Sequence, residues 1–375
     1  MSGDPSFAID GRRIGAGHPP FVVAELSGNH NGNLHRALAL IDAAKRAGAD
    51  AVKLQTYTAD TMTLDGGEPC FRIEGGPWHG RRLYDLYAEA STPWVWHDAL
   101  FARCREIGLP AFSTPFDATA VDFLERFDPP AYKIASFELV DLPLIGRVAA
   151  TGKPLILSTG MASPAEIDEA ITAARGGGCR ELVLLHCVSA YPAEPRASRL
   201  HAIPELAARA GVPVGLSDHT LGTAVAVAAV ALGACFIEKH MTLRRADGGP
   251  DATFSLEPAE FTDLVRDCRV AWQAVNGSPA ETCDSEQGNR RLRRSLFVVE
   301  DVAKGEPFTP ASVRSIRPAD GLPPKHLSLV LGCRASRDIA RGTPLAWDML
   351  APGSKTTGRA SSGSRAALSR RVKRA

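Results

Sequence analysis

Eight short apolar runs, each followed by an alanine-rich segment, recur between residues 20 and 275. Most of these runs are continuously apolar rather than alternating, which is typical of parallel strands buried on both faces. Because a parallel pair needs a crossover connection, each alanine-rich segment is expected to form the helix between two neighbouring strands. The expected strands span residues 21–26, 51–55, 110–114, 131–135, 154–158, 182–187, 213–217 and 235–240.

Eight strand–helix units predict an α/β fold of the (β/α)8 type, a TIM barrel. Amphipathic segments at 34–47 and 164–175 are predicted helices. Glycines such as Gly48 and Gly211 stand just after such segments, where the left-handed conformation ends a helix. A doubly wound open sheet is the alternative. Against it, the first strand lacks the glycine-rich loop of a dinucleotide-binding sheet.

The rest of the chain differs in composition from the barrel. The insert at 57–93 is rich in Gly, Trp, Tyr and Pro, and long loops of this kind usually shape an active site. A mostly β module of under 60 residues follows the barrel and is only marginally stable by itself, so we expect it to pack on something larger. The predicted order is an N-terminal segment at 1–19, the barrel at 20–276, a linker at 277–294, the small β module at 295–352 and a basic, disordered tail at 353–375.

Composition excludes several classes of protein. Hydrophobic residues make up 45% and charged residues 23%, the balance of a soluble globular chain. No apolar run reaches the roughly 20 residues that span a bilayer, and the N-terminus lacks the pattern of a secretory signal. The eight cysteines include no CxxC pair, which favours a reducing, cytoplasmic setting. The basic tail has no interleaved aromatic residues, so no nucleic-acid partner is expected.

Polar side chains stand at the ends of the predicted strands. A barrel interior is normally filled with Val, Ile and Leu, so charged groups inside strands need partners or a ligand. Any one of them could serve a structural hydrogen bond, but the whole set at corresponding strand ends favours a site for a substrate with phosphate and carboxylate oxygens. The set comprises Glu25, Lys53, Gln55, Ser113, Thr114, Lys133, Ser136, Ser158, Thr159, His186, Ser217, His219, Glu238 and His240.

Two of these residues, His219 and His240, end neighbouring predicted strands that are joined by one helix at 222–233. Their imidazoles should emerge at the same edge of the sheet, where two histidines can share one divalent cation. Asp251, on the loop that leaves the last strand, is either an outer-shell metal group or a solvated turn carboxylate. His186 is at least as well explained by a hydrogen bond within the core as by metal binding.

Several motifs resemble the sialic acid synthase family in order and spacing. They are Val23 to Asn31 (VAELSGNHN), Ala49 to Thr56 (ADAVKLQT), Tyr132 to Ser136 (YKIAS), Gly215 to His219 (GLSDH) and Glu238-Lys239-His240. The resemblance covers residues 20 to 350 and implies that the C-terminal module is an antifreeze-like (SAF) domain. Residues 83–87, 92–96, 315–318, 321–322 and 337–345 look like the pseudaminic acid synthase branch. One departure is Gly28, where that branch commonly has alanine.

This resemblance implies that phosphoenolpyruvate condenses with a 2,4-diacetamido-2,4,6-trideoxy sugar of the altrose series. The products would be a nine-carbon 2-keto sugar acid and phosphate. The alternative is the same reaction on N-acetylmannosamine or on the legionaminic acid precursor, because the sequence does not reveal sugar stereochemistry. The implied cofactor is a divalent metal ion, Mn²⁺, Mg²⁺ or Co²⁺, without an organic cofactor.

The family also implies a role for individual residues. His219 and His240 match the metal ligands. Glu25 matches the acidic residue that orients or deprotonates water, and Asp251 matches a carboxylate near the metal. Arg317 matches an arginine that one subunit places over the barrel of the other, which implies a domain-exchanged homodimer. Lys53, Thr114, Lys133, Ser136, Ser158 and Ser217 match phosphoenolpyruvate-binding positions, and Gln55, Tyr191 and Glu238 belong to the expected substrate site.

Two rival functions use the same residues differently. A Schiff-base aldolase would form an imine at Lys133 or Lys53, but such an enzyme needs no paired histidines. A carbohydrate-binding protein with an inactive barrel would have no reason to keep Glu25, both lysines and both histidines.

Overall fold

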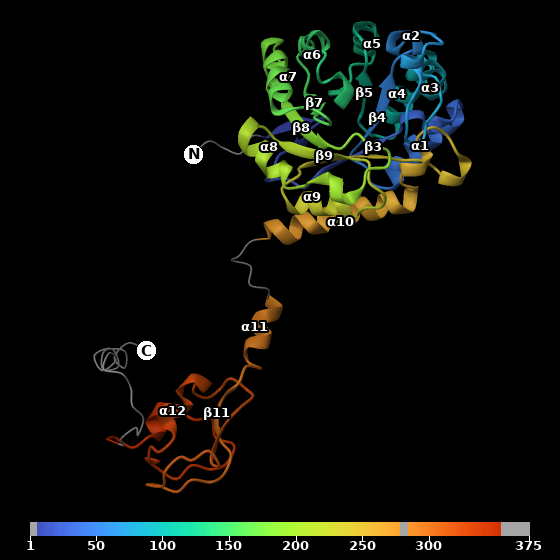
Figure 1. The fold of residues 1–375 in the computed structure, drawn as a ribbon. Helices are drawn as coiled ribbons and strands as arrows, with labels where there is room; N and C mark the ends of the chain where they lie inside the picture. Colours follow the sequence, from blue (N-terminus) through green and yellow to red (C-terminus); the bar gives the residue numbers. More distant parts are fainter. Residues whose placement is uncertain (1–5, 278–283, 354–375) are drawn as a thin grey trace. The chain divides into compact units, whose positions relative to one another are not determined.

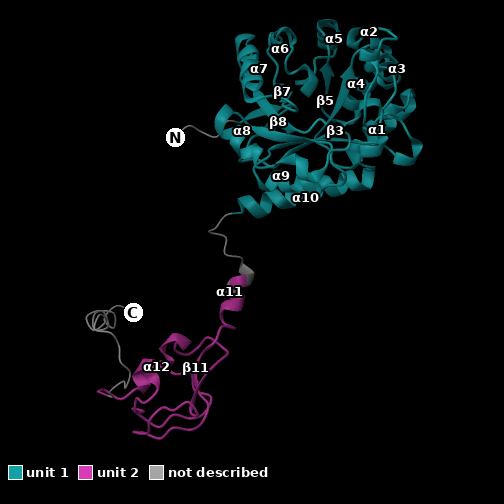
Figure 2. Cartoon of the chain, viewed as in Figure 1, with its two compact units in different colours: residues 1–277 teal, residues 278–375 magenta. Residues whose placement is uncertain are grey.

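The structure is a computed structural model that describes residues 6–277 and 284–353. The chain divides into two compact units, residues 1–277 and 278–375 (Figure 2). The predicted barrel and β module fall in different units, and each unit is described by itself below. No helix among the described residues is long and apolar enough to cross a membrane.

Within residues 6–277, eight parallel strands form a closed barrel (Figure 1). Each strand pairs with the next along the chain, and the last pairs with the first. The closed barrel confirms the predicted fold and shows that the open-sheet alternative is wrong. The strands are β3 (Phe21–Glu25), β4 (Ala51–Thr56), β5 (Ala111–Pro115), β6 (Tyr132–Ile134), β7 (Leu155–Ser158), β8 (Leu182–Cys187), β9 (Val214–Asp218) and β10 (Phe236–His240).

Helices follow the strands and surround the barrel (Figure 1). Local sequence signals set their ends. Asn33 caps the first helix by accepting a hydrogen bond from the Arg36 amide, and Ser163 forms a capping box with Glu166. Gly211 ends another helix with a φ of 64°. The helices are α1 (Leu34–Arg46), α4 (His97–Glu106), α5 (Ala118–Leu124), α6 (Leu142–Ala149), α7 (Pro164–Gly176), α8 (Ala202–Ala210), α9 (Ala224–Ala231) and α10 (Pro258–Asn276).

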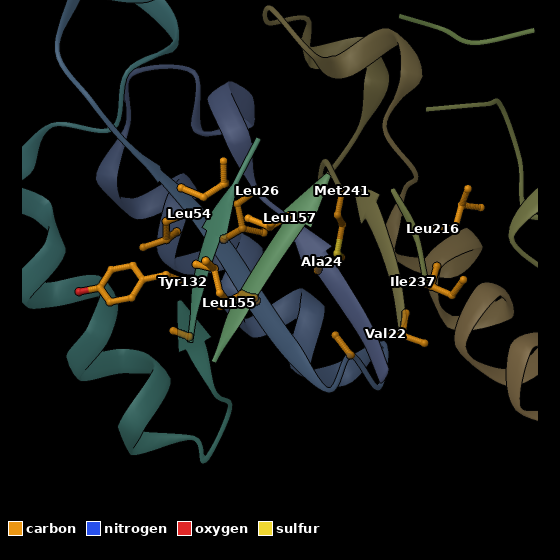
Figure 3. Packing of buried hydrophobic residues seen from close by; sticks show 14 of the residues in the cluster. Val22, Ala24, Leu26, Leu54, Tyr132, Leu155, Leu157, Leu216, Ile237 and Met241 are labelled. Carbon is orange, nitrogen blue, oxygen red and sulfur yellow. The ribbon is translucent and has the colours of Figure 1, made fainter. Parts of the chain in front are cut away.

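The barrel strands bury both of their faces in two separate apolar clusters. Residues such as Val22, Leu157 and Ile237 face outward and pack with the helices (Figure 3). The alternate residues, including Phe21 and Phe236, form a second cluster inside the barrel. Side chains alternate along a strand, so the next inward-facing positions toward the C-terminal end of each strand belong to the same face. Those positions are mostly polar. The strand pattern therefore aims the polar residues into the barrel mouth.

A hairpin precedes the barrel and consists of β1 (Phe7–Ile9) and β2 (Arg12–Ile14). Its turn residues Asp10 and Gly11 have φ values of 47° and 76°, as a tight two-residue hairpin turn requires. Phe7, Ile9 and Ile14 belong to the inner barrel cluster, so the hairpin packs against the apolar end of the interior. The sequence predicted only an N-terminal segment at 1–19 without assigned elements, since two three-residue strands are too short to show periodicity.

The insert between β4 and β5 has its own short elements, α2 (Ala59–Met62), η2 (Pro69–Phe71), α3 (Leu83–Ala90) and η3 (Trp94–Trp96). A bridge between Arg72 and Arg82 closes its long loop, and Arg82 also forms ion pairs with Asp65 and Asp85. The insert is therefore an ordered loop with secondary structure of its own.

The second unit has its own apolar core, which includes Leu296, Val298 and Phe308. β11 (Ser295–Val298) and β12 (Val313–Ile316) pair antiparallel, and α12 (Leu327–Val330) follows them. This is the small, mostly β module that the sequence predicted. The predicted linker contains a helix, α11 (Asp284–Arg290), while residues 278–283 of that linker and 354–375 of the basic tail lie outside the described residues.

Candidate active site

The inward-facing residues at the C-terminal ends of the barrel strands form one buried polar cluster. It contains most of the residues predicted for the site. Parity along each strand places the members within the strands there, while Ser136 comes from the turn that follows β6. The buried members are Glu25, Lys53, Thr114, Lys133, Ser136, Ser158, Ser217, His219, Glu238 and His240. Gln55, Tyr191 and Asp251 are partly buried.

Lys53 lies between two carboxylates at the centre of this cluster. Its Nζ is 2.5 Å from Glu25 Oε2 and 3.7 Å from Glu238 Oε1, and it donates a hydrogen bond to Thr114 Oγ1 at 3.1 Å. Burial opposes the charged ammonium, but the carboxylates of Glu238 and Glu25 outweigh it, so the pKa of Lys53 lies above its usual value. This lysine therefore stays charged.

The two carboxylates differ in their surroundings. Burial, helped by the charge of Glu238, raises the pKa of Glu25 although Lys53 opposes the shift. Burial also acts on Glu238, but the charges of Lys133 and Lys53 outweigh it, so the pKa of Glu238 is lowered. Glu238 Oε1 accepts a hydrogen bond from Ser217 Oγ at 3.1 Å. Glu25 is thus the more basic carboxylate of the pair, and Glu238 is the one that stays charged to lower pH.

Neighbouring donors fix the orientation of Glu25. Its Oε1 accepts hydrogen bonds from the Ser27 amide at 2.9 Å and from Gln55 Nε2 at 3.2 Å. The carboxylate cannot turn without breaking both contacts, so Oε2 faces Lys53.

A second part of the cluster presents hydrogen-bonding atoms that the protein itself does not use. Lys133 Nζ donates to the Ile134 carbonyl at 3.0 Å and retains further protons, while burial lowers its pKa. Among the described residues, Ser158 Oγ and Glu238 Oε2 are buried without a hydrogen-bond partner. Ser136 Oγ accepts from the Gly160 amide at 3.0 Å. Buried polar atoms without partners are costly, and a bound ligand would satisfy them.

His219 and His240 lie side by side with their ring centroids 5.3 Å apart. Nδ1 of His219 lies 3.1 Å from the Val188 carbonyl, and Nδ1 of His240 lies 3.1 Å from Ser27 Oγ. With Nδ1 occupied in both rings, each Nε2 remains for a ligand. Burial and then the charge of His219 hold the pKa of His240 well below its usual value, which keeps that ring neutral.

His219 has a different electrostatic setting. Burial lowers its pKa, but the nearby Cys187 Sγ, 3.8 Å from Nδ1, and the Val188 carbonyl raise it to a net upward shift. Cys187 was not among the predicted site residues, although it faces inward on β8.

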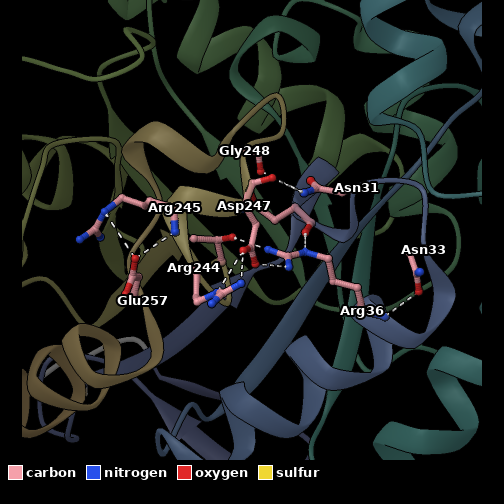
Figure 4. Close-up of polar contacts among 10 residues, drawn as sticks. Asn31, Asn33, Arg36, Arg244, Arg245, Asp247, Gly248 and Glu257 are labelled. Atoms are coloured by element: carbon pink, nitrogen blue, oxygen red, sulfur yellow. Dashed lines mark hydrogen bonds and ion pairs between the residues drawn. The ribbon is translucent and has the colours of Figure 1, made fainter.

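Asp251 reaches the site from the loop after β10. Its Oδ2 accepts a hydrogen bond from the Gly28 amide at 3.3 Å, and burial raises its pKa. A polar network holds the loop against the first strand–helix connection. Arg36 pairs with Asp247 at 2.5 Å, and Asn31 Nδ2 donates to the Gly248 carbonyl at 3.0 Å (Figure 4).

Aromatic rings surround the two histidines. The Tyr191 centroid is 4.5 Å from that of His219, and the Phe254 centroid is 5.0 Å from that of His240. Trp78, from the insert, packs against Tyr191 at 5.5 Å and donates from Nε1 to the Pro250 carbonyl at 2.8 Å. Sequence analysis identified Tyr191 and the insert but not Trp78, since a single aromatic residue in a glycine-rich loop gives no periodic signal.

The structure separates several predicted polar residues from the inward-facing set. Ser113 and Thr159 follow the outward parity of their strands: Ser113 Oγ lies 2.7 Å from Thr56 Oγ1, and Thr159 Oγ1 donates to the Leu185 carbonyl at 3.2 Å. His186 follows the outward parity of β8, and its Nε2 lies 2.6 Å from the Ser198 carbonyl, which agrees with the structural alternative for that residue. Arg317 is exposed and lies in the second unit, just after β12.

Glu138, in η5 (Ser136–Glu138) after β6, is a further acidic residue that sequence analysis missed. Burial raises its pKa to about 7 despite the opposing charge of Lys133, and its Oε2 has no hydrogen-bond partner among the described residues. The available signal was its position two residues after Ser136, in the loop that follows a strand end.

Comparison with known proteins identifies the family. Residues 40–279 match the NeuB family and residues 293–351 match the SAF domain. The chain belongs to the NeuB family. A pseudaminic acid synthase from Helicobacter pylori is 42% identical over 88% of this chain and 97% of its own length. An N,N'-diacetyllegionaminic acid synthase from Legionella pneumophila is 36% identical over 88% of this chain and 94% of its own.

A solved NeuB-like structure agrees with this assignment. The N-acetylneuraminic acid synthetase from Leptospira borgpetersenii, crystallised with citrate, superposes with a TM-score of 0.68 at 31% identity. The superposition covers 76% of this chain and 95% of the synthetase chain. The NeuB match thus lies almost wholly in the first unit, and the SAF match lies in the second.

Proposed function

We propose that this chain is a pseudaminic acid synthase, which condenses phosphoenolpyruvate with 2,4-diacetamido-2,4,6-trideoxy-altrose to give a nine-carbon 2-keto sugar acid and phosphate. The observation that carries the proposal is the buried inward-facing cluster in which Lys53, Lys133 and unpartnered polar atoms lie near two histidines. Greater identity to the pseudaminic acid synthase than to the legionaminic acid synthase, 42% against 36%, supports the choice of sugar.

Phosphoenolpyruvate carries a phosphate and a carboxylate, and the cluster offers cations and hydroxyl donors for both. Lys53 remains charged between its carboxylates, and Lys133 has protons that its one hydrogen bond does not use. In a buried site such charge-assisted contacts are stronger than in water. We assign Thr114, Ser136, Ser158 and Ser217 as the remaining donors, with Gln55, Tyr191 and Glu238 lining the substrate site.

His219 and His240 would hold a divalent cation, which we propose is Mn²⁺, Mg²⁺ or Co²⁺. A zinc ion lies about 2.0–2.1 Å from an imidazole nitrogen, and rings whose centroids are 5.3 Å apart are close enough to share a divalent ion at comparable distances. Among residues 6–277 and 284–353, no group of three or more His, Cys, Asp or Glu side chains could hold a metal. Two protein ligands imply a weakly held ion whose other positions go to water or substrate. When bound, it would act as a Lewis acid on the aldehyde oxygen of the sugar.

The reaction balances with one molecule of water. C3 of phosphoenolpyruvate forms a bond to the aldehyde carbon, the aldehyde oxygen takes a proton, and C2 becomes an oxocarbenium ion. Water adds to C2 as it loses a proton, and the resulting intermediate expels phosphate to leave the 2-keto group. Glu25, oriented by Ser27 and Gln55, is our candidate to orient or deprotonate this water.

For the second unit, we propose the arrangement that the family resemblance implies. The SAF domain of one subunit would bring Arg317 to the sugar bound in its partner's barrel, as part of a domain-exchanged homodimer. The guanidinium would add a charge-assisted contact to the substrate.

Purified protein supplied with phosphoenolpyruvate and Mn²⁺ tests the proposal through phosphate release. Three sugars are compared in parallel: the altrose derivative, the legionaminic acid precursor and N-acetylmannosamine. We expect the largest kcat/KM with the altrose derivative. A larger kcat/KM with the legionaminic acid precursor would instead assign the protein as a legionaminic acid synthase. Absence of phosphate release with all three sugars would reject the proposed synthase activity.

A further inference from the structure

A second buried ion pair lies on the opposite face of the two strands that carry the histidines. Lys239 Nζ is 2.5 Å from Asp218 Oδ2, and the two side chains are 0% and 1% exposed. Each residue directly precedes one histidine, Asp218 before His219 and Lys239 before His240. Because side chains alternate along a strand, the ion pair faces the helices while the histidines face the barrel interior.

The pair extends into a network that encloses His219. Asp218 Oδ1 accepts hydrogen bonds from the Thr220 amide at 2.9 Å and from Thr220 Oγ1 at 2.8 Å. Lys239 Nζ also donates to the Thr220 carbonyl at 2.6 Å. The Lys239 side chain therefore holds both neighbours of His219 in place, Asp218 before it and Thr220 after it.

Other outward-facing positions on these strands are apolar. Leu216 and Ile237, two residues earlier on β9 and β10, pack in the outer cluster (Figure 3). Replacing a buried ion pair by apolar residues is often neutral or stabilising, so stability alone does not account for charges at these two positions. What distinguishes the positions is that both adjoin the histidines.

We propose that Asp218 and Lys239 are positioning residues whose ion pair sets the spacing and orientation of His219 and His240, and thereby the affinity for a divalent cation. The inference rests on the metal site of the proposed function. Groups that hydrogen-bond directly to metal ligands typically change metal affinity by about 10–100-fold when they are removed. The Asp218–Lys239 pair acts through the backbone next to each histidine, so we expect an effect at the lower end of this range.

The double variant Asp218→Asn/Lys239→Met tests the proposal without leaving an unpaired buried charge. Metal-free protein is titrated with Mn²⁺ and free Mn²⁺ is followed by electron paramagnetic resonance, while thermal unfolding reports stability. We expect a Tm close to that of the wild type and Mn²⁺ binding weakened about tenfold or more. Wild-type affinity in the double variant would overturn the proposal.

Ile237→Ala is the matched control, because Ile237 is fully buried on the same face of the same strand and has an apolar side chain. It should lower Tm and leave Mn²⁺ affinity of the folded protein unchanged. Equal weakening in this control would mean that general loosening of the barrel controls the affinity, which would also overturn the proposal. If the double variant does not fold, Thr220→Val removes one donor to Asp218 and must weaken Mn²⁺ binding for the proposal to stand.

His219→Ala and His240→Ala separate failure of the metal site from failure of this inference. If neither substitution affects Mn²⁺ binding, or if the wild type binds no Mn²⁺, the metal part of the proposed function fails and the positioning role fails with it. If both substitutions abolish binding while the double variant retains it, only the positioning role is rejected.

Discussion

Glu25 and Lys53 are direct partners in the register of neighbouring barrel strands, and Lys53 Nζ lies 2.5 Å from Glu25 Oε2. Both side chains are buried, so the contact lies in a setting where charge interactions are strong. Ser27 and Gln55 hold the other oxygen of Glu25. The Glu25 carboxylate, which we assign to orient or deprotonate the attacking water, is thus fixed in place before any substrate binds.

Glu25→Gln should abolish most activity while preserving the fold. The amide keeps the shape of the side chain but removes its basicity, and general bases typically contribute about 10²–10⁴-fold to a rate. We expect kcat to fall within that range in steady-state assays of phosphate release run well below the Tm. The Tm itself should also fall, because Lys53 keeps only the more distant Glu238 as a charged partner. Glu169→Gln, an exposed carboxylate on α7, is the control and should behave as the wild type. A Glu25→Gln enzyme with normal kcat would remove Glu25 from the mechanism.

Glu138→Gln should stabilise the protein in a pH-dependent way. The folded pKa of about 7 exceeds the ordinary value of 4.5, so the unfolded chain loses this proton first and stability falls as pH rises from about 4.5 to 7. Glutamine removes that penalty, so the gain should be small at pH 5 and reach at most about 3 kcal/mol at pH 8. Urea unfolding at both pH values measures it. A gain that is larger at pH 5 than at pH 8 would contradict the raised pKa.

Gly28→Ala should displace the loop that carries Asp251. A Cβ atom at residue 28 would lie 2.7 Å from Pro250 Cγ and 3.1 Å from Ala90 Cβ. Since the Gly28 amide also donates to Asp251, we expect kcat to fall about tenfold or more through misplacement of the site. Gly17→Ala, where an added Cβ meets no atom within 4 Å, is the matched control. Equal kcat in both variants would show that the loop tolerates the shift.

Arg317→Ala should raise the KM for the sugar and leave the KM for phosphoenolpyruvate unchanged. A hydrogen bond to a charged group is worth about 1.5–3 kcal/mol, which corresponds to roughly a 10–100-fold rise. Arg314→Ala removes an exposed arginine on β12 of the same unit and serves as the control.

Truncation of the chain after residue 288 should lower activity severely and weaken the dimer, because it removes the SAF domain. Sedimentation of the truncated chain measures its oligomeric state. A truncated chain that remains fully active as a monomer would contradict the proposed domain exchange.

Continuous apolar runs made the barrel predictable, because both faces of each strand are buried and the helices between them have clear end signals. Polar residues inside those runs, such as Lys53 and Glu238, had to face the interior or find a partner, so the buried polar cluster of the candidate site was also predictable in outline. The sequence could not show which of two adjacent residues at a strand end faces the interior. His186 and Cys187 are such a pair, and only the closed barrel shows that Cys187 faces inward. Trp78 and Glu138 were missed since loop residues reach the site through tertiary packing that has no period.

The fate of one oxygen atom tests the central claim most directly. Phosphoenolpyruvate labelled with ¹⁸O at the oxygen that bridges C2 and phosphorus is incubated with the altrose derivative and Mn²⁺, and both products are analysed by mass spectrometry. Because water attacks C2 in the proposed reaction, the label should leave with the phosphate, and a nine-carbon 2-keto acid should form in equal amount. Label retained at C2 of the acid, or phosphate released without a nine-carbon acid, would contradict it.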